Sequence, residues 1–250
     1  MNSLTFNKLN PLSYAVEEAI NTLCTNLSFA GANVRKIMLT SCHASEGKSF
    51  LTMNIMRTMA KLEKTITLVD ADLRRSMINS RFGVKFDNPE KKQGLSHYLA
   101  GMAELDDVFY STNMSGAYMV PVGREVANAL PLLNSPRFPA LLDELSKRTE
   151  YVLVDVPPVG TVIDAAEIAK SCDGAVIAVG YNDVHRKELI DTKEQLERTG
   201  CPILGAVLNM VELGDYVSKK YYYKSYYSHY YNYYTSEEET SGKKSRKKNR

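Results

Sequence analysis

Short segments that are apolar throughout alternate with helical segments along most of the chain, and this alternation restricts the fold more than any other feature. A strand without a polar face must be buried on both sides, which is typical of a parallel sheet with helices on both faces. The pattern therefore predicts an α/β fold with a mostly parallel sheet. The expected strands are residues 36–41, 65–69, 117–122, 151–156, 175–179 and 203–209; the expected helices are residues 14–28, 47–62, 138–148, 165–171 and 186–199. Residues 80–115 are expected to be irregular, apart from a short helix near residues 95–99.

The end of the chain differs in composition from the rest. Of the 16 tyrosines, nine lie between Tyr221 and Tyr234, and no aliphatic residue accompanies them. A segment without aliphatic side chains cannot bury a core of its own. An acidic run at residues 237–239 and a basic end at residues 243–250 follow. We therefore expect one folded domain at residues 1–215 and a disordered, tyrosine-rich tail at residues 216–250.

The charge balance argues against nucleic-acid binding. The net charge is +2, but six basic side chains lie in residues 243–250, so the rest of the chain carries −4. A mildly acidic body lacks the basic surface that a polyanion requires. The four cysteines are widely spaced and form no C-x-x-C pair, which indicates reduced thiols in a cytosolic protein. The N-terminus does not resemble a signal peptide, and no apolar stretch reaches the roughly 18 residues that span a membrane.

An imperfect phosphate-binding loop follows the first expected strand. Residues 42–49 read CHASEGKS, which matches the end of G-x-x-x-x-G-K-[ST], although Cys42 stands where the first glycine belongs. Gly47 allows backbone N–H groups to approach phosphate oxygens, and a helix N-terminus adds its positive dipole end. Lys48 would reach the β- and γ-phosphates, and Ser49 would offer its hydroxyl to Mg²⁺. The alternative is a chance G-K-S sequence at a helix start.

Two further motifs end in carboxylates. Asp70 and Asp72 follow the second expected strand, where ligands bind in open α/β sheets. Their side chains would point the same way only if the strand extended through both, and the alternative is a solvated acidic turn. The strand at residues 151–156 contains Asp155 after an apolar run, which is the Walker B pattern for a carboxylate that orients Mg²⁺.

These residues together resemble the bacterial tyrosine kinases of polysaccharide synthesis, a family of P-loop ATPases, over nearly the whole chain. Residues 46–49 resemble the family's Walker A motif, residues 68–74 its Walker A′ motif and residues 153–159 its Walker B motif. Residues 94–101 and 204–209 are further similar stretches. The resemblance implies a P-loop NTPase fold, ATP and Mg²⁺ as cofactors, and a protein tyrosine kinase that regulates capsular or extracellular polysaccharide synthesis or export.

The resemblance assigns roles residue by residue. It implies a catalytic set of Lys48, Asp70, Asp72 and Asp155, with Mg²⁺ held by Ser49, Asp70 and Asp155. A tyrosine hydroxyl has a pKa of about 10, so a carboxylate base must accept its proton as the bond to phosphorus forms. Asp72 is the expected base, with Asp70 as the alternative. The nucleotide contacts are expected at Ser45, Glu46, Gly47, Lys48, Ser49 and Phe50.

Three departures from the family pattern matter. Ala44 and Ser45 replace the usual Pro-Gly, and Ser45 would be strained if the loop needs a positive φ there. The family's Glu-x-x-Arg-x-x-Arg, used between subunits of a ring, gives way to Glu18, Asn21 and Cys24, which predicts a monomer or small oligomer. The usual Pro-Asn-Pro stretch reads Ala-Asn-Ala at residues 127–129.

The tyrosine cluster corresponds to the family's autophosphorylation site. A flexible tether gives its hydroxyls a high effective concentration at a neighbouring active site, which implies self-association through tail-to-site contacts. The family also implies an activating membrane adaptor of the polysaccharide co-polymerase type, a phosphotyrosine phosphatase, and a cytoplasmic location at the inner face of the membrane. The expected acceptors are Tyr221, Tyr222, Tyr223, Tyr226, Tyr227, Tyr230, Tyr231, Tyr233 and Tyr234.

Two other functions remain open on the sequence. A positioning ATPase of the septum-site and plasmid-partition kind would share the strand order, but its signature lysine corresponds to His43 in this chain. A nucleotide-binding scaffold with little kinase activity would present the tyrosines to other kinases. A eukaryotic-type protein kinase is excluded because the chain has no H-R-D, D-F-G or A-P-E set.

Overall fold

The structure is a computed structural model that describes residues 2–160, 163–181 and 183–211. The folded unit comprises Met1–Met210. The predicted domain boundary after residue 215 and the predicted tail lie outside the described residues. The strands are β1 (Asn2–Phe6), β2 (Lys36–Ser41), β3 (Ile66–Asp70), β4 (Val84–Phe86), β5 (Tyr110–Ser111), β6 (Ala117–Val120), β7 (Tyr151–Asp155), β8 (Gly174–Gly180) and β9 (Ile203–Asn209). The helices are α1 (Tyr14–Ser28), α2 (Lys48–Lys61), α3 (Ile78–Phe82), α4 (Leu95–Leu99), α5 (Leu105–Val108), α6 (Leu130–Leu133), α7 (Arg137–Arg148), α8 (Asp164–Ala169) and α9 (Arg186–Glu197), with a 3₁₀ turn at Pro89–Lys91.

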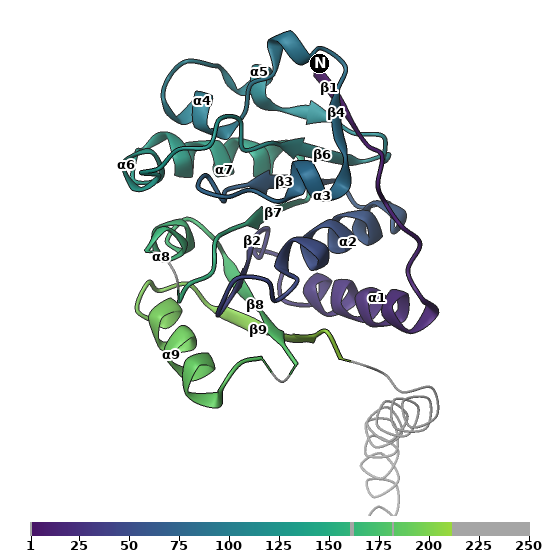
Figure 1. The fold of residues 1–250 in the computed structure, drawn as a ribbon, viewed down its shortest axis with the longest axis vertical. Coiled ribbons are helices and arrows are strands. Elements are labelled where there is room, and N and C mark those ends of the chain that lie inside the picture. Colours follow the sequence, from purple (N-terminus) through teal and green to yellow (C-terminus); the bar gives the residue numbers. More distant parts are fainter. Residues whose placement is uncertain (1, 161–162, 182, 212–250) are drawn as a thin grey trace, which may run out of the picture. The chain divides into compact units, whose positions relative to one another are not determined.

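The described strands form one sheet in the order β4-β1-β5-β6-β3-β7-β2-β8-β9 (Figure 1). From β6 to β9 all neighbours are parallel, whereas β4 runs antiparallel to β1 and β5 antiparallel to β6. The carboxyl ends of β2, β3 and β7 therefore lie at one edge of the sheet, where open α/β sheets bind ligands. The predicted α/β class, with a mostly parallel sheet, is confirmed.

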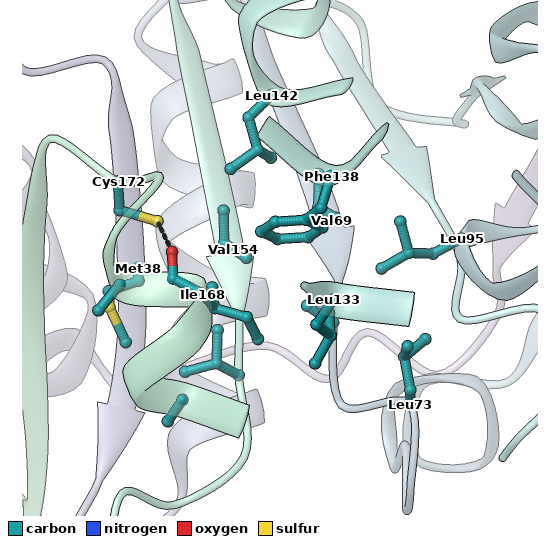
Figure 2. Packing of buried hydrophobic residues seen from close by; sticks show 14 of the residues in the cluster. Met38, Val69, Leu73, Leu95, Leu133, Phe138, Leu142, Val154, Ile168 and Cys172 are labelled. Carbon is teal, nitrogen blue, oxygen red and sulfur yellow. Dashed lines mark hydrogen bonds between the residues drawn. The ribbon is translucent and has the colours of Figure 1, made fainter. Parts of the chain in front are cut away.

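Helices cover both faces of this sheet, and each face has its own apolar cluster. Successive side chains of a strand point to opposite faces, so Met38 of β2 joins one cluster while Ile37 and Leu39 join the other. The first cluster packs against α7, α8 and α9 and contains Phe138 and Val154, both fully buried (Figure 2). The second packs against α1 and α2. The core strands thus lack a polar face because both of their faces are buried.

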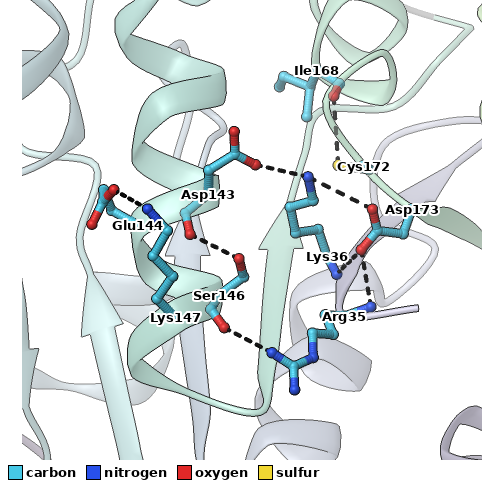
Figure 3. Close-up of polar contacts among 9 residues, drawn as sticks. All are labelled: Arg35, Lys36, Asp143, Glu144, Ser146, Lys147, Ile168, Cys172 and Asp173. Carbon is cyan, nitrogen blue, oxygen red and sulfur yellow. Dashed lines mark hydrogen bonds and ion pairs between the residues drawn. The ribbon is translucent and has the colours of Figure 1, made fainter. Parts of the chain in front are cut away.

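A polar cluster fixes the start of β2, at the end of the strand opposite the phosphate-binding loop (Figure 3). The Asp173 carboxylate accepts hydrogen bonds from the backbone N–H groups of Arg35 (2.9 Å) and Lys36 (2.7 Å). The Lys36 ammonium lies 3.0 Å from Asp143 and 3.6 Å from Asp173. Partly exposed ion pairs of this kind contribute about 1 kcal/mol or less. Their main consequence is to fix the position of β2 relative to its neighbours, because they join β2 to α7 and to the turn before β8.

Two expectations about the chain's first half were wrong. Residues 80–115 are not irregular, since they contain α4, as expected, but also α5 and the strands β4 and β5. The N-terminal strand β1 was not expected, and it pairs with β4 through Leu4 and Phe86 and with β5 through Asn2 and Tyr110. These short strands have little periodicity of their own and form through pairing with distant segments. The other expected elements are present, with ends that differ by one or two residues.

Candidate functional site

The phosphate-binding loop connects β2 to α2 at the carboxyl edge of the sheet. Gly47 is the N-cap of α2 with φ of 79°, and α2 begins at Lys48. Its first backbone N–H groups are therefore free of helical partners and available to an anion. Ser45 has φ of 72°. The loop thus requires a left-handed conformation at Ser45, and the expected strain at this non-glycine residue is confirmed.

Glu46 shapes this loop from inside. Its carboxylate is fully buried and accepts hydrogen bonds from the backbone N–H groups of His43 (2.8 Å) and Gly180 (3.1 Å). The Asn209 side chain, at the end of β9, donates to the backbone carbonyl of Glu46 (2.9 Å). A Cβ atom on Gly47 would lie 2.1 Å from that Asn209 amide and would displace it, and the φ of 79° at this position also favours glycine. The Glu46 carboxylate therefore stabilises the loop and is not available to a nucleotide, so the predicted nucleotide contact of Glu46 could be made only by its backbone.

Asp155 is the centre of the polar contacts beside the loop. It ends β7, and its carboxylate accepts hydrogen bonds from the Lys48 ammonium (3.0 Å), the Ser49 hydroxyl (3.2 Å) and the Thr52 hydroxyl (3.0 Å). Asp155 and Lys48 are both buried. The loop and the Walker B strand, 107 residues apart, are thereby joined at the side chains predicted for phosphate and metal binding.

Asp70 ends β3 directly beside Asp155, its partner in the pairing of β3 with β7. Its side chain is fully buried, and Oδ1 has no hydrogen-bond partner among the described residues, while Oδ2 accepts a hydrogen bond from the Ser76 hydroxyl. Burial, and then the charge of Asp155, raise the pKa of Asp70 well above its usual range. Two neighbouring buried carboxylates with one unpartnered oxygen form a site that favours a cation.

These residues fit the binding of Mg²⁺ together with a nucleotide. Within the described residues no three His, Cys, Asp or Glu side chains group closely enough to hold a metal ion by themselves. Mg²⁺ in phosphoryl-transfer sites is bound by one or two carboxylates, with waters and substrate phosphates completing its shell. Ser49, Asp70 and Asp155 provide that kind of partial set beside the free N–H groups of α2. The side chain of Phe50 packs against the second apolar cluster, so only its backbone is free to make the predicted nucleotide contact.

Asp72 lies beyond the end of β3, so the strand does not extend through both carboxylates. Its Oδ1 accepts a hydrogen bond from the backbone N–H of Arg75 (3.0 Å). Burial raises the pKa of Asp72, while the nearby Lys48 ammonium acts in the opposite direction. Asp72 is only partly buried, unlike Asp70. Of the two acids, Asp72 is therefore the one that a substrate arriving from solvent can reach.

Sequence reasoning assigned no role to Thr52, Asn209 or Ser76. Thr52 lies four residues after Lys48, which places both on one face of α2 and is a signal that the sequence contains. Asn209 donates a hydrogen bond to Glu46 from a distant strand, and Ser76 donates one to Asp70 from the loop that follows it. No local pattern marks such contacts. The predicted acceptor tyrosines, Tyr221 to Tyr234, lie outside the described residues.

Substituting Ser45 by glycine should stabilise the protein by about 0.5–1 kcal/mol, because the left-handed conformation costs an L-residue more than glycine loses in chain entropy. Urea unfolding of both proteins measures the difference. Ser45→Ala is the matched control, since it removes the hydroxyl but keeps the Cβ atom. A glycine variant no more stable than the alanine variant would contradict the strain.

In protein stripped of divalent cations, Asp70→Asn should raise the free energy of unfolding at neutral pH by about 1–3 kcal/mol, because it removes a poorly partnered buried charge. The folded pKa of Asp70 is raised, so its ionisation lowers the stability of the wild type as pH increases from about 4 through that raised pKa. The variant should lose this pH dependence. Unfolding curves with a chelator at several pH values test it, with the exposed Asp191→Asn as control. A variant less stable than wild type at pH 8 would refute the argument.

Comparisons with known proteins agree on the fold and on one family. A family model described as ParA, NUBPL iron-transfer P-loop NTPase, matches residues 33–226. The tyrosine-protein kinase CpsD of Streptococcus pneumoniae is 34% identical over 197 residues, which cover 79% of this chain and 85% of that protein. The kinase domain of the Escherichia coli tyrosine kinase ETK superposes with a TM-score of 0.71 at 29% identity, covering 79% of this chain and 78% of that domain.

A fourth likeness concerns the fold alone. The septum site-determining protein MinD of Pyrococcus horikoshii has a TM-score of 0.62 at 23% identity, covering 72% of each chain. At the position of the signature lysine, His43 contacts Glu188 of α9, with 3.2 Å between Nε2 and Oε1. No helix among the described residues has the length and apolarity needed to cross a membrane.

Proposed function

The chain belongs to the CpsD-type bacterial tyrosine-protein kinases within the ParA-like P-loop NTPases, and from this premise we propose that it transfers the γ-phosphate of ATP to tyrosines of its own tail. The observation that carries the proposal is the convergence of Lys48, Ser49 and Asp155 beside Asp70, with Asp72 next to them. In the proposed roles, the groups that bind phosphate, bind the metal and accept the proton would lie together at one edge of the sheet.

Each side chain has one role in the proposed reaction. The N–H groups at the start of α2 and the Lys48 ammonium bind the phosphates. Ser49, Asp70 and Asp155 would hold Mg²⁺, which when bound neutralises charge on the phosphate oxygens. Asp72 orients the tyrosine hydroxyl and accepts its proton as the oxygen bonds to phosphorus. The Lys48 ammonium has three donors, so a phosphate can accept a hydrogen bond from it in addition to Asp155.

The tail explains why tyrosine is the acceptor in this proposal. Nine tyrosines occur between Tyr221 and Tyr234, on a segment tethered to the folded unit. Each phosphate adds nearly two negative charges, so a phosphorylated tail is repelled by the acidic residues of the site. Self-association through tail-to-site contacts should therefore weaken as phosphorylation proceeds. A phosphotyrosine phosphatase would reverse the change.

Membership of this family also suggests a cellular process and a location for the protein. We assign the protein to control of capsular or extracellular polysaccharide synthesis or export, at the inner face of the membrane, where an adaptor of the co-polymerase type activates it. The six basic residues in 243–250 would add an attraction to anionic lipid, about 1 kcal/mol for each side chain near the surface.

A second candidate is a positioning ATPase, favoured by the ParA family model. His43 in place of the signature lysine and the tyrosine-rich tail weigh against it. Rapid ATP hydrolysis without any tail labelling would favour this candidate. Nucleotide binding without hydrolysis or labelling would instead favour a scaffold.

Intact-mass spectrometry of the full chain with ATP and Mg²⁺, with and without the adaptor's cytoplasmic tail, tests the proposal. We expect a ladder of phosphate additions that maps to Tyr221–Tyr234. A variant with all nine of these tyrosines replaced by phenylalanine is the control and should show no ladder. An unchanged ladder in that variant would place the acceptors elsewhere, and no ladder in wild type under either condition would refute the kinase proposal.

A further inference from the structure

An arginine next to the predicted base is bound to two other segments of the fold. Arg74 donates to both carboxylate oxygens of Asp164, from Nε at 2.5 Å and from Nη2 at 3.0 Å. Its Nη1 donates to the backbone carbonyl of Ala127 at 2.7 Å. Asp164 is almost fully buried at the start of α8, the first helix after Asp155. We call this set of contacts the Arg74 clasp.

The clasp joins two loops to the start of a helix. One loop follows β3 and carries Asp72, the other lies between β6 and α6, and the helix is α8. The two loops are also joined by their backbones, since the N–H of Val126 donates to the carbonyl of Leu73 (2.9 Å). A bidentate arginine–carboxylate contact fixes orientation as well as distance, which a single lysine contact does not.

The clasp acts on the two residues that orient the site's carboxylates. Arg75, the next residue, donates its backbone N–H to Asp72. Ser76, one residue further, donates its hydroxyl to Asp70. Anchoring the Arg74 side chain therefore fixes the stretch of backbone from which both carboxylates receive hydrogen bonds. All three nitrogens of the Arg74 guanidinium donate to Asp164 or Ala127, so we assign Arg74 no contact with the phosphates.

We propose that Arg74 is a positioning residue for phosphoryl transfer: through Asp164 and Ala127 it holds the loop of Asp72 at the distance from the Walker B segment that the reaction requires. The inference rests on the proposed kinase function for its kinetic effect, and on the contacts alone for its structural effect. It predicts that loss of the clasp slows the transfer step while nucleotide binding, which depends on the loop at residues 42–49, changes little.

Three variants test the proposal in the full chain. Arg74→Lys keeps the charge but loses the bidentate contact. Arg74→Gln leaves the buried Asp164 without a cation and can fail to fold, so Arg74→Gln combined with Asp164→Asn removes both charges together. The matched control is Arg148→Gln. Arg148 ends α7, and the substitution removes its ion pair with Asp106 of α5, in which the two charged groups lie 2.6 Å apart. For each protein we would measure the initial rate of tail phosphorylation at saturating ATP, the Kd for MgADP, and hydrogen exchange.

The expected result is a rate about tenfold lower for both the lysine variant and the double variant, since small misplacements of reacting groups slow a reaction by one to two orders of magnitude. The Kd for MgADP should stay within about threefold of wild type, because the phosphate-binding loop is untouched. Amide exchange should accelerate at residues 72–76, and Arg148→Gln should change none of the three quantities.

Two results would overturn the proposal. The first is a phosphorylation rate within about twofold of wild type in the folded double variant, Arg74→Gln with Asp164→Asn. It would show that the transfer step does not need the clasp. A loss of nucleotide affinity as large as the loss of rate would show a general structural role. If wild type itself shows no phosphorylation, the kinase function fails, and the clasp is then judged by exchange alone: unchanged protection at residues 72–76 in the double variant would refute it.

Discussion

Replacing Lys48 by methionine should lower tail phosphorylation by roughly 10³-fold, which is the loss typical when a charge-stabilising donor is removed from a site. Methionine keeps most of the length and the apolar stem of lysine but removes the ammonium that contacts Asp155 and that we assign to the phosphates. The measurement is the initial rate of phosphate addition, followed by intact-mass spectrometry in purified protein at saturating ATP and Mg²⁺.

Lys61→Met is the matched control for this variant. Lys61 ends the same helix, and its ammonium forms an exposed ion pair with Glu17, far along α2 from the phosphate-binding loop. Its substitution should leave the rate unchanged. Circular dichroism should show that both variants are folded. Tail phosphorylation that persists in pure, folded Lys48→Met protein would contradict the assignment of residues 42–49 as the phosphate-binding loop.

Asp72→Asn should lower the rate by about 10²–10³-fold, which is within the range that a positioned general base contributes. The amide can still accept the hydrogen bond from the backbone N–H of Arg75, so the loop is kept while the proton acceptor is lost. Because burial raises the pKa of Asp72, the wild-type rate should fall on the acid side at a higher pH than an ordinary carboxylate would give.

The control for Asp72 is Asp191→Asn, an exposed acid on α9. It removes the same charge from the protein without touching the site. A Kd for MgADP that stays near the wild-type value in Asp72→Asn would separate loss of the base from loss of the nucleotide. If Asp72→Asn retained more than about a tenth of the wild-type rate, Asp70 would become the better candidate for the base.

The parts of the fold that the sequence predicted correctly are those whose signal is local. The strands β2, β3 and β7 are mostly apolar and buried on both faces, and this pattern can be recognised without knowing which strands they pair with. The strands β1, β4 and β5 are short, and their pairing depends on segments that lie far apart, such as Asn2 and Tyr110. Their formation is a property of the sheet rather than of their own residues.

The candidate site divides in the same way. Lys48, Ser49, Asp70 and Asp155 were predicted because each occupies a motif position at the end of a strand or the start of a helix, and the structure places them together. Asn209 and the Arg74–Asp164 contact were not predicted, because they depend on how distant loops approach one another. The sequence left open whether the loop needs a positive φ at Ser45, and the structure shows that it has one.

The hydrogen bond from Asn209 to Glu46 has a consequence for how the protein matures on the ribosome. The two residues are 163 positions apart, so the start of the phosphate-binding loop is synthesised long before the strand that braces it. The ribosome adds about 5–20 residues per second. For many seconds a growing chain would therefore contain β2 and α2 without the hydrogen bond from Asn209 to the loop between them. If the loop binds nucleotide as proposed, a chain truncated before residue 203 should bind it more weakly, because that chain lacks the hydrogen bond from Asn209.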